Sequence, residues 1–122
     1  MKALVVDDSR AMRSILSHAL KEAGFDEIAQ AQHGKEGLAY LLDHPDTAIA
    51  LVDWNMPEMN GLQMVQAVRK EDALRAVRLM MVTTETESSH MQQALDDGAD
   101  EYVMKPFTKD VIADKLRLLG FC

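Results

Sequence analysis

The sequence predicts an α/β protein built on a parallel sheet that helices cover on both faces. Two observations support this fold class. Short apolar runs alternate five times with segments whose apolar residues recur at three- and four-residue spacing, the period of a helix. All of the runs except the weaker second one are apolar almost throughout, as strands buried on both faces are. With 122 residues and 48% apolar composition, the chain is expected to form a single domain, residues 1–122.

The five predicted strands are short apolar runs that end at polar or turn-forming residues. The second run is the most polar of the five. The predicted strands are Ala3–Asp7, Glu27–Gln32, Ala48–Val52, Leu79–Val82 and Tyr102–Met104.

Five helices are expected to follow these strands, each with one apolar face. Residues that cap helices precede four of them, and glycines end two. The expected starts are Ser9, residue 34, Asn60 or Gly61, Ser88 or Ser89, and Thr108, and the expected ends include Gly24 and Gly98. The apolar faces are expected to include Ile15, Leu42 and Val111.

Charge and cysteine content limit the possible functions. The formal net charge of −7 disfavours binding to a nucleic-acid backbone. No apolar run approaches the ~20 residues of a membrane span, and the N-terminus lacks a signal-peptide pattern. The single cysteine, Cys122, cannot form a disulfide framework. We therefore expect a cytoplasmic protein, without membrane insertion, that binds a cation or a partner protein.

Polar side chains follow four of the five predicted strands. The carboxyl ends of parallel strands share one edge of the sheet, where ligands bind and helix N-termini favour anions. The second strand ends in Gln32 and His33 and offers nothing comparable. The polar residues are Asp7 and Asp8 after the first strand, Asp53 after the third, Thr83 after the fourth and Lys105 after the fifth.

Together these side chains are typical of a site for phosphoryl chemistry. Three neighbouring carboxylates repel one another, and a divalent cation such as Mg²⁺, or alternatively Mn²⁺, relieves that repulsion. Lys105 and Thr83 add a positive charge and a hydroxyl donor for phosphoryl oxygens. An aspartate can itself accept a phosphoryl group. Each residue also has a simpler interpretation, such as a solvated strand end for Asp7 and Asp8 or a helix cap for Asp53, but their joint occurrence favours the site.

Four segments resemble the signature segments of bacterial response-regulator receiver domains: VVDDSRAMRSIL, LVDWNMPEMNGLQM, MVTTE and DEYVMKPFT. They occur in order along the whole chain, and the similarity is closest to single-domain chemotaxis receivers of the CheY type. The resemblance implies a flavodoxin-like (βα)5 three-layer sandwich with strand order 2-1-3-4-5. That order places the first and third strands side by side, as the convergence of the three aspartates requires.

The resemblance also implies roles for the matched residues. Asp53 would accept the phosphoryl group from a partner's phosphohistidine. Asp8, Asp53 and the backbone carbonyl of Asn55 would hold Mg²⁺, and Asp7 would bind the ion through water.

Other matched residues would bind the phosphoryl group or change conformation when it is bound. Thr83 and Lys105 would bind phosphoryl oxygens. Tyr102 matches the aromatic residue that acts as a switch in the family. Its ring would turn inward as Thr83 moves toward the phosphate. This change would alter the face made by the fourth helix, the fifth strand and the fifth helix. Pro106 matches a lysine–proline step that is usually cis in the family. Trp54 is expected to be a partly exposed reporter beside the site.

Three positions are expected to modulate the site. Thr84 stands where many receivers carry Ala or Gly, and it is expected to narrow access to the phosphate. Asn55 and Glu85 match a variable pair that implies a short-lived phosphorylated state. The segment Glu85–His90 lacks the lysines of the best-known chemotaxis receiver, which leaves the motor-switch partner open.

The expected function is a two-component signalling switch in chemotaxis or motility. It would catalyse its own phosphorylation and dephosphorylation and no other reaction. Its partners would be a histidine kinase or histidine phosphotransfer domain and an effector protein, and the protein would be a monomer or weak dimer. A phosphorelay intermediate, or a receiver from a longer regulator, remains an alternative. An aspartyl-phosphate phosphatase is a further alternative, although it needs a second aspartate where this chain has Ser9.

Overall fold

The order of strands and helices follows the predicted alternation. The computed structural model of the protein describes residues 1–84 and 88–121. Its elements are β1 (Lys2–Val6), α1 (Arg10–Glu22), β2 (Glu27–Ala31), α2 (Gly34–Asp43), β3 (Ile49–Asp53), α3 (Gly61–Arg69), a short 3₁₀ helix (Asp72–Leu74), β4 (Arg78–Thr84), α4 (Ser88–Asp97), β5 (Glu101–Lys105) and α5 (Lys109–Leu118).

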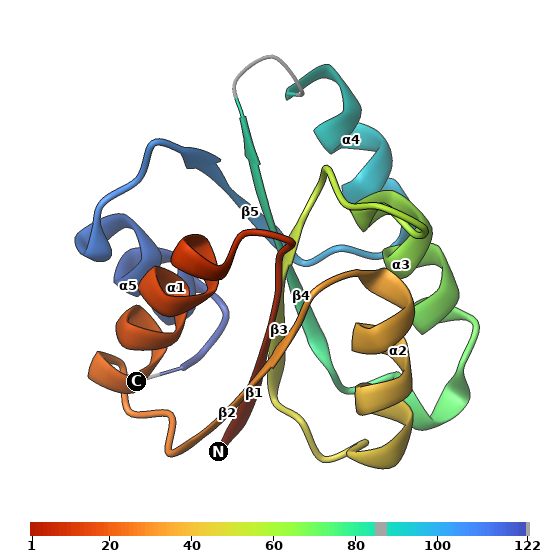
Figure 1. Cartoon of the computed structure of the whole chain (residues 1–122), viewed down its shortest axis with the longest axis horizontal. Helices are drawn as coiled ribbons and strands as arrows, with labels where there is room; N and C mark the ends of the chain where they lie inside the picture. The colour runs from red at the N-terminus through yellow and green to blue at the C-terminus, as the bar shows by residue number, and fades with distance from the viewer. Residues whose placement is uncertain (85–87, 122) are drawn as a thin grey trace.

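The described strands form one parallel sheet in the order β2-β1-β3-β4-β5, as predicted. Helices α1 and α5 cover one face, and α2, α3 and α4 cover the other, so the fold is a three-layer sandwich (Figure 1). In the sheet register, Val6 of β1 lies beside Ala31 on one side and Val52 on the other. The ends of β1 and β3 therefore meet at the same edge.

Alternate residues of the central strands pack into two separate cores. Leu4 and Val6 of β1 belong to the core beneath α2, α3 and α4. Ala3 and Val5 belong to the core beneath α1 and α5. Because both faces are buried from Ala3 to Val6, these four positions have to be apolar, which explains the unbroken apolar run.

Local sequence correctly marks several helix starts. Ser9 and Thr108 cap α1 and α5 through their hydroxyl oxygens. Of the two candidates for α3, Asn60 is the cap, since its side chain and that of Gln63 form a reciprocal capping box. The predicted cap of α4 involves side chains that lie outside the described residues.

Several expectations about exposure are wrong. Ile15, Leu42 and Val111 are 50%, 44% and 39% exposed. Successive helix residues point about 100° apart, so Leu42 turns away from the sheet when Leu41 faces it. Trp54, expected to be partly exposed, is only 8% exposed, and its ring stacks on that of His90 with centroids 5.4 Å apart.

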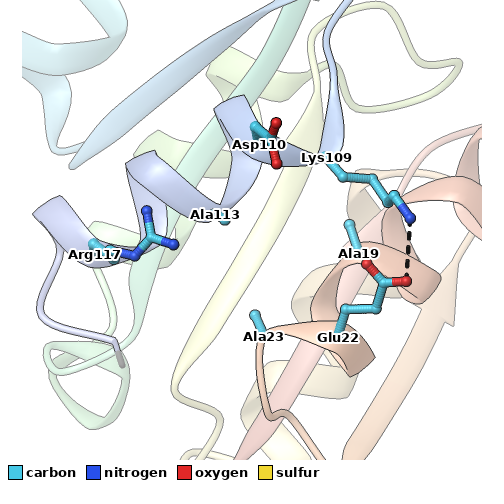
Figure 2. A pocket seen from close by; sticks show the side chains of 7 residues that line it. All are labelled: Ala19, Glu22, Ala23, Lys109, Asp110, Ala113 and Arg117. Carbon is cyan, nitrogen blue, oxygen red and sulfur yellow. Dashed lines mark hydrogen bonds and ion pairs between the residues drawn. The ribbon is translucent and has the colours of Figure 1, made fainter.

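A groove of about 400 Å³ lies between α1 and α5 (Figure 2). Three alanines line it, and an ion pair of 3.2 Å between Lys109 Nζ and Glu22 Oε1 links the two helices beside it. The groove shares no residue with the acidic strand ends. Within the described residues, no helix is long and apolar enough to cross a membrane.

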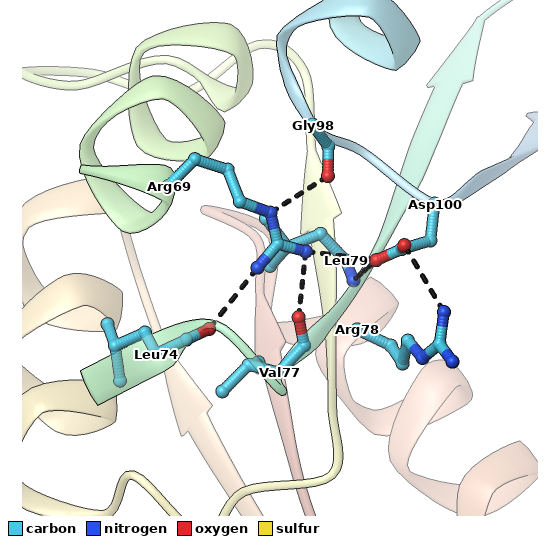
Figure 3. A network of polar contacts seen from close by, with 7 residues as sticks. All are labelled: Arg69, Leu74, Val77, Arg78, Leu79, Gly98 and Asp100. Carbon is cyan, nitrogen blue, oxygen red and sulfur yellow. Dashed lines mark hydrogen bonds and ion pairs between the residues drawn. The ribbon is translucent and has the colours of Figure 1, made fainter. Parts of the chain in front are cut away.

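Arg69 joins several segments near the starts of β4 and β5, at the amino ends of these strands (Figure 3). Its guanidinium donates hydrogen bonds to the carbonyl oxygens of Gly98, Leu74 and Val77, at 2.9, 3.2 and 2.8 Å. It also pairs with Asp100 at 3.0 Å. The end of α3 is thereby joined to the chain segments that lead into β4 and β5.

Candidate functional site

Three aspartates from two neighbouring strands converge at the carboxyl edge of the sheet. Asp7 and Asp8 follow β1, and Asp53 ends β3. Each offers a carboxylate oxygen, and the three oxygens lie within 4.8 Å of one another. Asp7 and Asp53 are buried, whereas Asp8 is exposed. The convergence predicted from the strand ends is therefore present in the structure.

Lys105 brings a positive charge from β5 into this acidic cluster, which we define as Asp7, Asp8 and Asp53. Its Nζ donates to Asp53 Oδ1 at 3.0 Å and lies 3.8 Å from Asp7 Oδ2. The lysine is half-buried, so this charge is only partly screened by solvent.

Asp7 keeps one oxygen without a hydrogen bond. Its Oδ1 accepts the Ser9 N–H at 2.8 Å, and its own N–H donates to Ala31 O at 3.1 Å. Within the described residues, Oδ2 is buried and accepts no hydrogen bond. A buried carboxylate oxygen that accepts no hydrogen bond is costly, and it is the type of group that a bound cation would satisfy.

The environment raises the pKa values of both buried carboxyls. Burial, with the charge of Asp7 beside it, raises the pKa of Asp53 to about 6, although Lys105 opposes the shift. Burial also raises the pKa of Asp7, against the Ser9 hydrogen bond and Lys105. The cluster therefore holds protons more readily than isolated aspartates do. A small divalent cation such as Mg²⁺, which prefers oxygen ligands, can replace those protons.

The residues expected around the cluster lie near it along the strands. Thr83 is fully buried and follows Val82, the residue that pairs with Asp53 in the sheet. Its hydroxyl donates to Thr84 O at 3.4 Å. Thr84 is half-buried and Asn55 is exposed. Glu85, the other expected modulator, lies outside the described residues.

Tyr102 lies on β5, close to charged neighbours. Lys115 Nζ of α5 lies 5.2 Å from the centroid of the tyrosine ring and pairs with Glu101 Oε1 at 3.1 Å. The Lys105–Pro106 peptide bond is cis, as the resemblance implied.

Sequence reasoning missed the role of Gly61, which begins α3. Its N–H donates to Trp54 O at 2.9 Å. A Cβ at this position would lie 2.6 Å from Asp53 O, 2.7 Å from Met81 Cε and 3.0 Å from the Trp54 Cα. Helix α3 can therefore approach the main chain of Asp53 this closely only with glycine here.

The end of β2 has a structural role that sequence reasoning missed. His33, just after β2, accepts the Glu36 N–H at 3.3 Å and so caps α2. Its other ring nitrogen lies 3.1 Å from Glu58 Oε2, in the loop between β3 and α3. The end of β2 therefore braces the loop that follows Asp53. A histidine just before a helical segment was the available signal.

Comparisons with known proteins agree with this geometry. The response regulator receiver domain family matches residues 3–117. Chemotaxis protein CheY1 of Helicobacter pylori is 40% identical over 119 residues, which cover 98% of this chain and 96% of the relative. The chemotaxis protein CheY homolog of Campylobacter jejuni is 43% identical over 116 residues, which cover 95% and 89%. The solved structure of the chemotaxis response regulator CheY4 of Vibrio cholerae has a TM-score of 0.87 and 34% identity, and 97% of each chain is covered. On the family match and these identities, the chain belongs to the response regulator receiver domain family.

Proposed function

We propose that this protein, as one receiver domain over residues 1–122, is a CheY-like response regulator that accepts a phosphoryl group on Asp53 and acts in chemotaxis or motility. The observation that carries the proposal is the Lys105 Nζ–Asp53 Oδ1 bond of 3.0 Å beside two further aspartates. Receivers of this kind are signalling proteins rather than classical enzymes. They act with histidine kinases and effector proteins.

The acidic cluster fits the Mg²⁺ that receiver domains bind, because it brings together three carboxylates, and one of their oxygens, Asp7 Oδ2, accepts no hydrogen bond within the described residues. Asp8, Asp53 and the Asn55 carbonyl would hold the ion directly, and Asp7 would do so through water. When bound, the ion offsets negative charge at the carboxylates and on the incoming phosphoryl group.

In phosphorylation, a carboxylate oxygen of Asp53 would attack the phosphorus atom of a phosphohistidine. The new O–P bond forms as the P–N bond breaks, and the electron pair leaves with the imidazole. Lys105 Nζ, already at the carboxylate, and the Thr83 hydroxyl would hold the phosphoryl oxygens. Attack of water on phosphorus would later return the carboxylate and release phosphate, at a rate set by Asn55 and Glu85.

The output would pass from Thr83 to Tyr102, on the face made by α4, β5 and α5. Movement of Thr83 toward the phosphoryl group would make room for the tyrosine ring. A cytoplasmic effector protein would then bind the changed face. Thr84, half-buried at the end of β4, would narrow the entry to the phosphate.

The direct test combines ion binding with phosphorylation. Mg²⁺ is titrated, beryllofluoride or acetyl phosphate is added, and Trp54 fluorescence is followed, since this buried ring adjoins Asp53 and stacks on His90. Mass spectrometry should find one acid-stable, base-labile phosphate. Absence of a Mg²⁺-dependent signal and of the phosphate would reject the proposal, and turnover of a soluble phosphomonoester would indicate a phosphatase instead.

Asp8→Asn is expected to weaken Mg²⁺ binding more than Asp7→Asn. Asp8 would contact the ion directly, whereas Asp7 would act through water, and groups of the latter kind contribute about 10–100-fold to metal affinity. Isothermal calorimetry of Mg²⁺ binding measures both variants. The reverse order of affinities would contradict the assignment of the two ligands.

Thr83→Ala is expected to keep phosphorylation but to weaken the response of Tyr102. The variant removes a fully buried hydroxyl that would follow the phosphoryl group, while Asp53 and Lys105 remain. NMR signals of the Tyr102 ring, with and without beryllofluoride, measure the response. Thr83→Ser, which keeps the hydroxyl, is the control and should respond as the wild type does; equal responses of all three proteins would exclude a role for the hydroxyl.

A further inference from the structure

Arg13 is a buried cation close to the acidic cluster. It lies early in α1, and it is 8% exposed. A positive charge near a helix N-terminus is electrostatically unfavourable. Burying a charge is also costly, and an apolar side chain would pack at this position at less cost. An arginine here therefore calls for a specific partner.

That partner is the main chain between the first two aspartates. Arg13 Nη1 donates to the carbonyl oxygen of Asp7 at 2.8 Å, and this hydrogen bond is buried. The carbonyl belongs to the planar peptide group that joins Asp7 to Asp8. Fixing this plane restricts the directions in which both carboxylate side chains leave the main chain.

The other polar groups of Asp7 are held from different elements. Its N–H donates to the carbonyl oxygen of Ala31, the last residue of the neighbouring strand β2. Its Oδ1 accepts the N–H of Ser9. With the carbonyl held by Arg13, Oδ2 is left in the acidic cluster without a hydrogen bond within the described residues, 3.8 Å from Lys105 Nζ. Arg13 thus belongs to the set of contacts that orients this oxygen.

The guanidinium is itself held in place by neutral groups. Arg13 Nε donates to Gln30 Oε1 on β2 at 3.2 Å, and Gln30 Nε2 donates to Ser17 Oγ at 3.2 Å. Both side-chain hydrogen bonds of Arg13 within the described residues therefore go to uncharged oxygen atoms. Its positive charge is directed at the Asp7–Asp8 peptide group.

We propose that Arg13 is a positioning residue for the metal site: its bond to the Asp7 carbonyl holds the Asp7–Asp8 peptide group so that both carboxylates face a divalent cation. This inference rests on the proposed function. Groups that orient metal ligands without touching the ion contribute about 10–100-fold to affinity. Loss of the bond is therefore expected to weaken Mg²⁺ binding about tenfold or more.

The test measures the Mg²⁺ dissociation constant by calorimetry in wild type, Arg13→Met, Arg13→Gln and Arg13→Lys, with folding checked by circular dichroism. Methionine and glutamine remove the guanidinium, and the use of two variants covers the case in which one does not fold. Lysine keeps the positive charge and an N–H donor near the carbonyl, on a side chain one bond shorter. The matched control is Arg69→Met, because Arg69 also bonds carbonyl oxygens but near the amino ends of β4 and β5.

The expected result is a tenfold or greater loss in the Met and Gln variants, with Arg13→Lys and Arg69→Met within about threefold of wild type. Wild-type affinity in a folded Met or Gln variant would overturn the positioning role alone. An equal loss in the Arg69 control would also overturn it, because general destabilisation would then explain the effect. A wild-type protein that binds no Mg²⁺ would overturn the proposed function, and this inference with it.

Discussion

Asp53→Asn is expected to abolish phosphorylation by acetyl phosphate completely. The amide of asparagine is a far weaker nucleophile than a carboxylate, and neither Asp7 nor Asp8 lies at the end of β3, where Lys105 makes its 3.0 Å bond. Intact-protein mass spectrometry after incubation with acetyl phosphate and Mg²⁺ measures the effect. Stoichiometric phosphate on the variant would show that Asp53 is not the acceptor.

The same substitution is expected to stabilise the ion-free fold at neutral pH. Burial raises the pKa of Asp53 from its ordinary value of 3.8 to about 6, so the folded state binds this proton more tightly than the unfolded state does. The resulting stabilisation is fully present below about pH 4 and is lost as the pH rises through about 6. Between about pH 5 and about pH 7, the wild type should lose about 1 kcal/mol of unfolding free energy from this group.

Urea unfolding with EDTA at both pH values measures this loss, which Asp53→Asn should not show. Asp72→Asn is the matched control, because the Asp72 side chain is 96% exposed, and it should keep the wild-type pH dependence. If wild type and Asp53→Asn had the same pH dependence, the raised pKa of Asp53 would be refuted.

Gly61→Ala is expected to destabilise the protein by about 2–3 kcal/mol and to slow phosphorylation. On helix propensity alone, alanine should be the better residue by about 1 kcal/mol. The new Cβ would, however, lie 2.6 Å from Asp53 O and 3.0 Å from Trp54 Cα. These are main-chain atoms that cannot rotate away, so β3 and α3 have to separate just where Asp53 is placed.

Thermal or urea unfolding gives the stability change, and the rate of modification by acetyl phosphate gives the effect on the site. Gly24→Ala is a suitable control. Its φ of +104° makes alanine strained, but a Cβ there has open space and is remote from β3. It should lower stability by about 1 kcal/mol and leave the phosphorylation rate unchanged. A Gly61→Ala protein with wild-type stability and rate would show that the close approach is not needed.

Much of the site was predictable because the chain order of a parallel sheet determines which residues share an edge. Asp53 ends β3 and Lys105 ends β5, so both lie at the same edge of the sheet, and the long lysine side chain reaches Asp53 across β4. Helix caps such as Ser9 and Thr108 were predictable for a different reason. A cap is a bond between residues three apart, and its signal is therefore local.

Other features depended on segments that lie far apart in the sequence. Trp54 is buried in the core beneath α2, α3 and α4, where its ring also stacks on that of His90, and no pattern around residue 54 carries that information. Gly61 has to be glycine because α3 lies against the main chain of Asp53. Arg13 is a charged residue in an amphipathic helix, and its neighbours in the sequence do not show that it is buried. Its two hydrogen-bond partners, Gln30 of β2 and the Asp7 carbonyl, come from other elements.

The sequence by itself determined the fold class, the edge at which the site forms and the identity of its polar groups. These follow from periodicity along the chain and from the direction of parallel strands. The tertiary structure decided which carboxylates are buried, how far their pKa values rise, and which side chains hold them in place. Desolvation and hydrogen bonding depend on what surrounds a group in three dimensions, and at Asp7 those surroundings come from β2, α1 and β5 together.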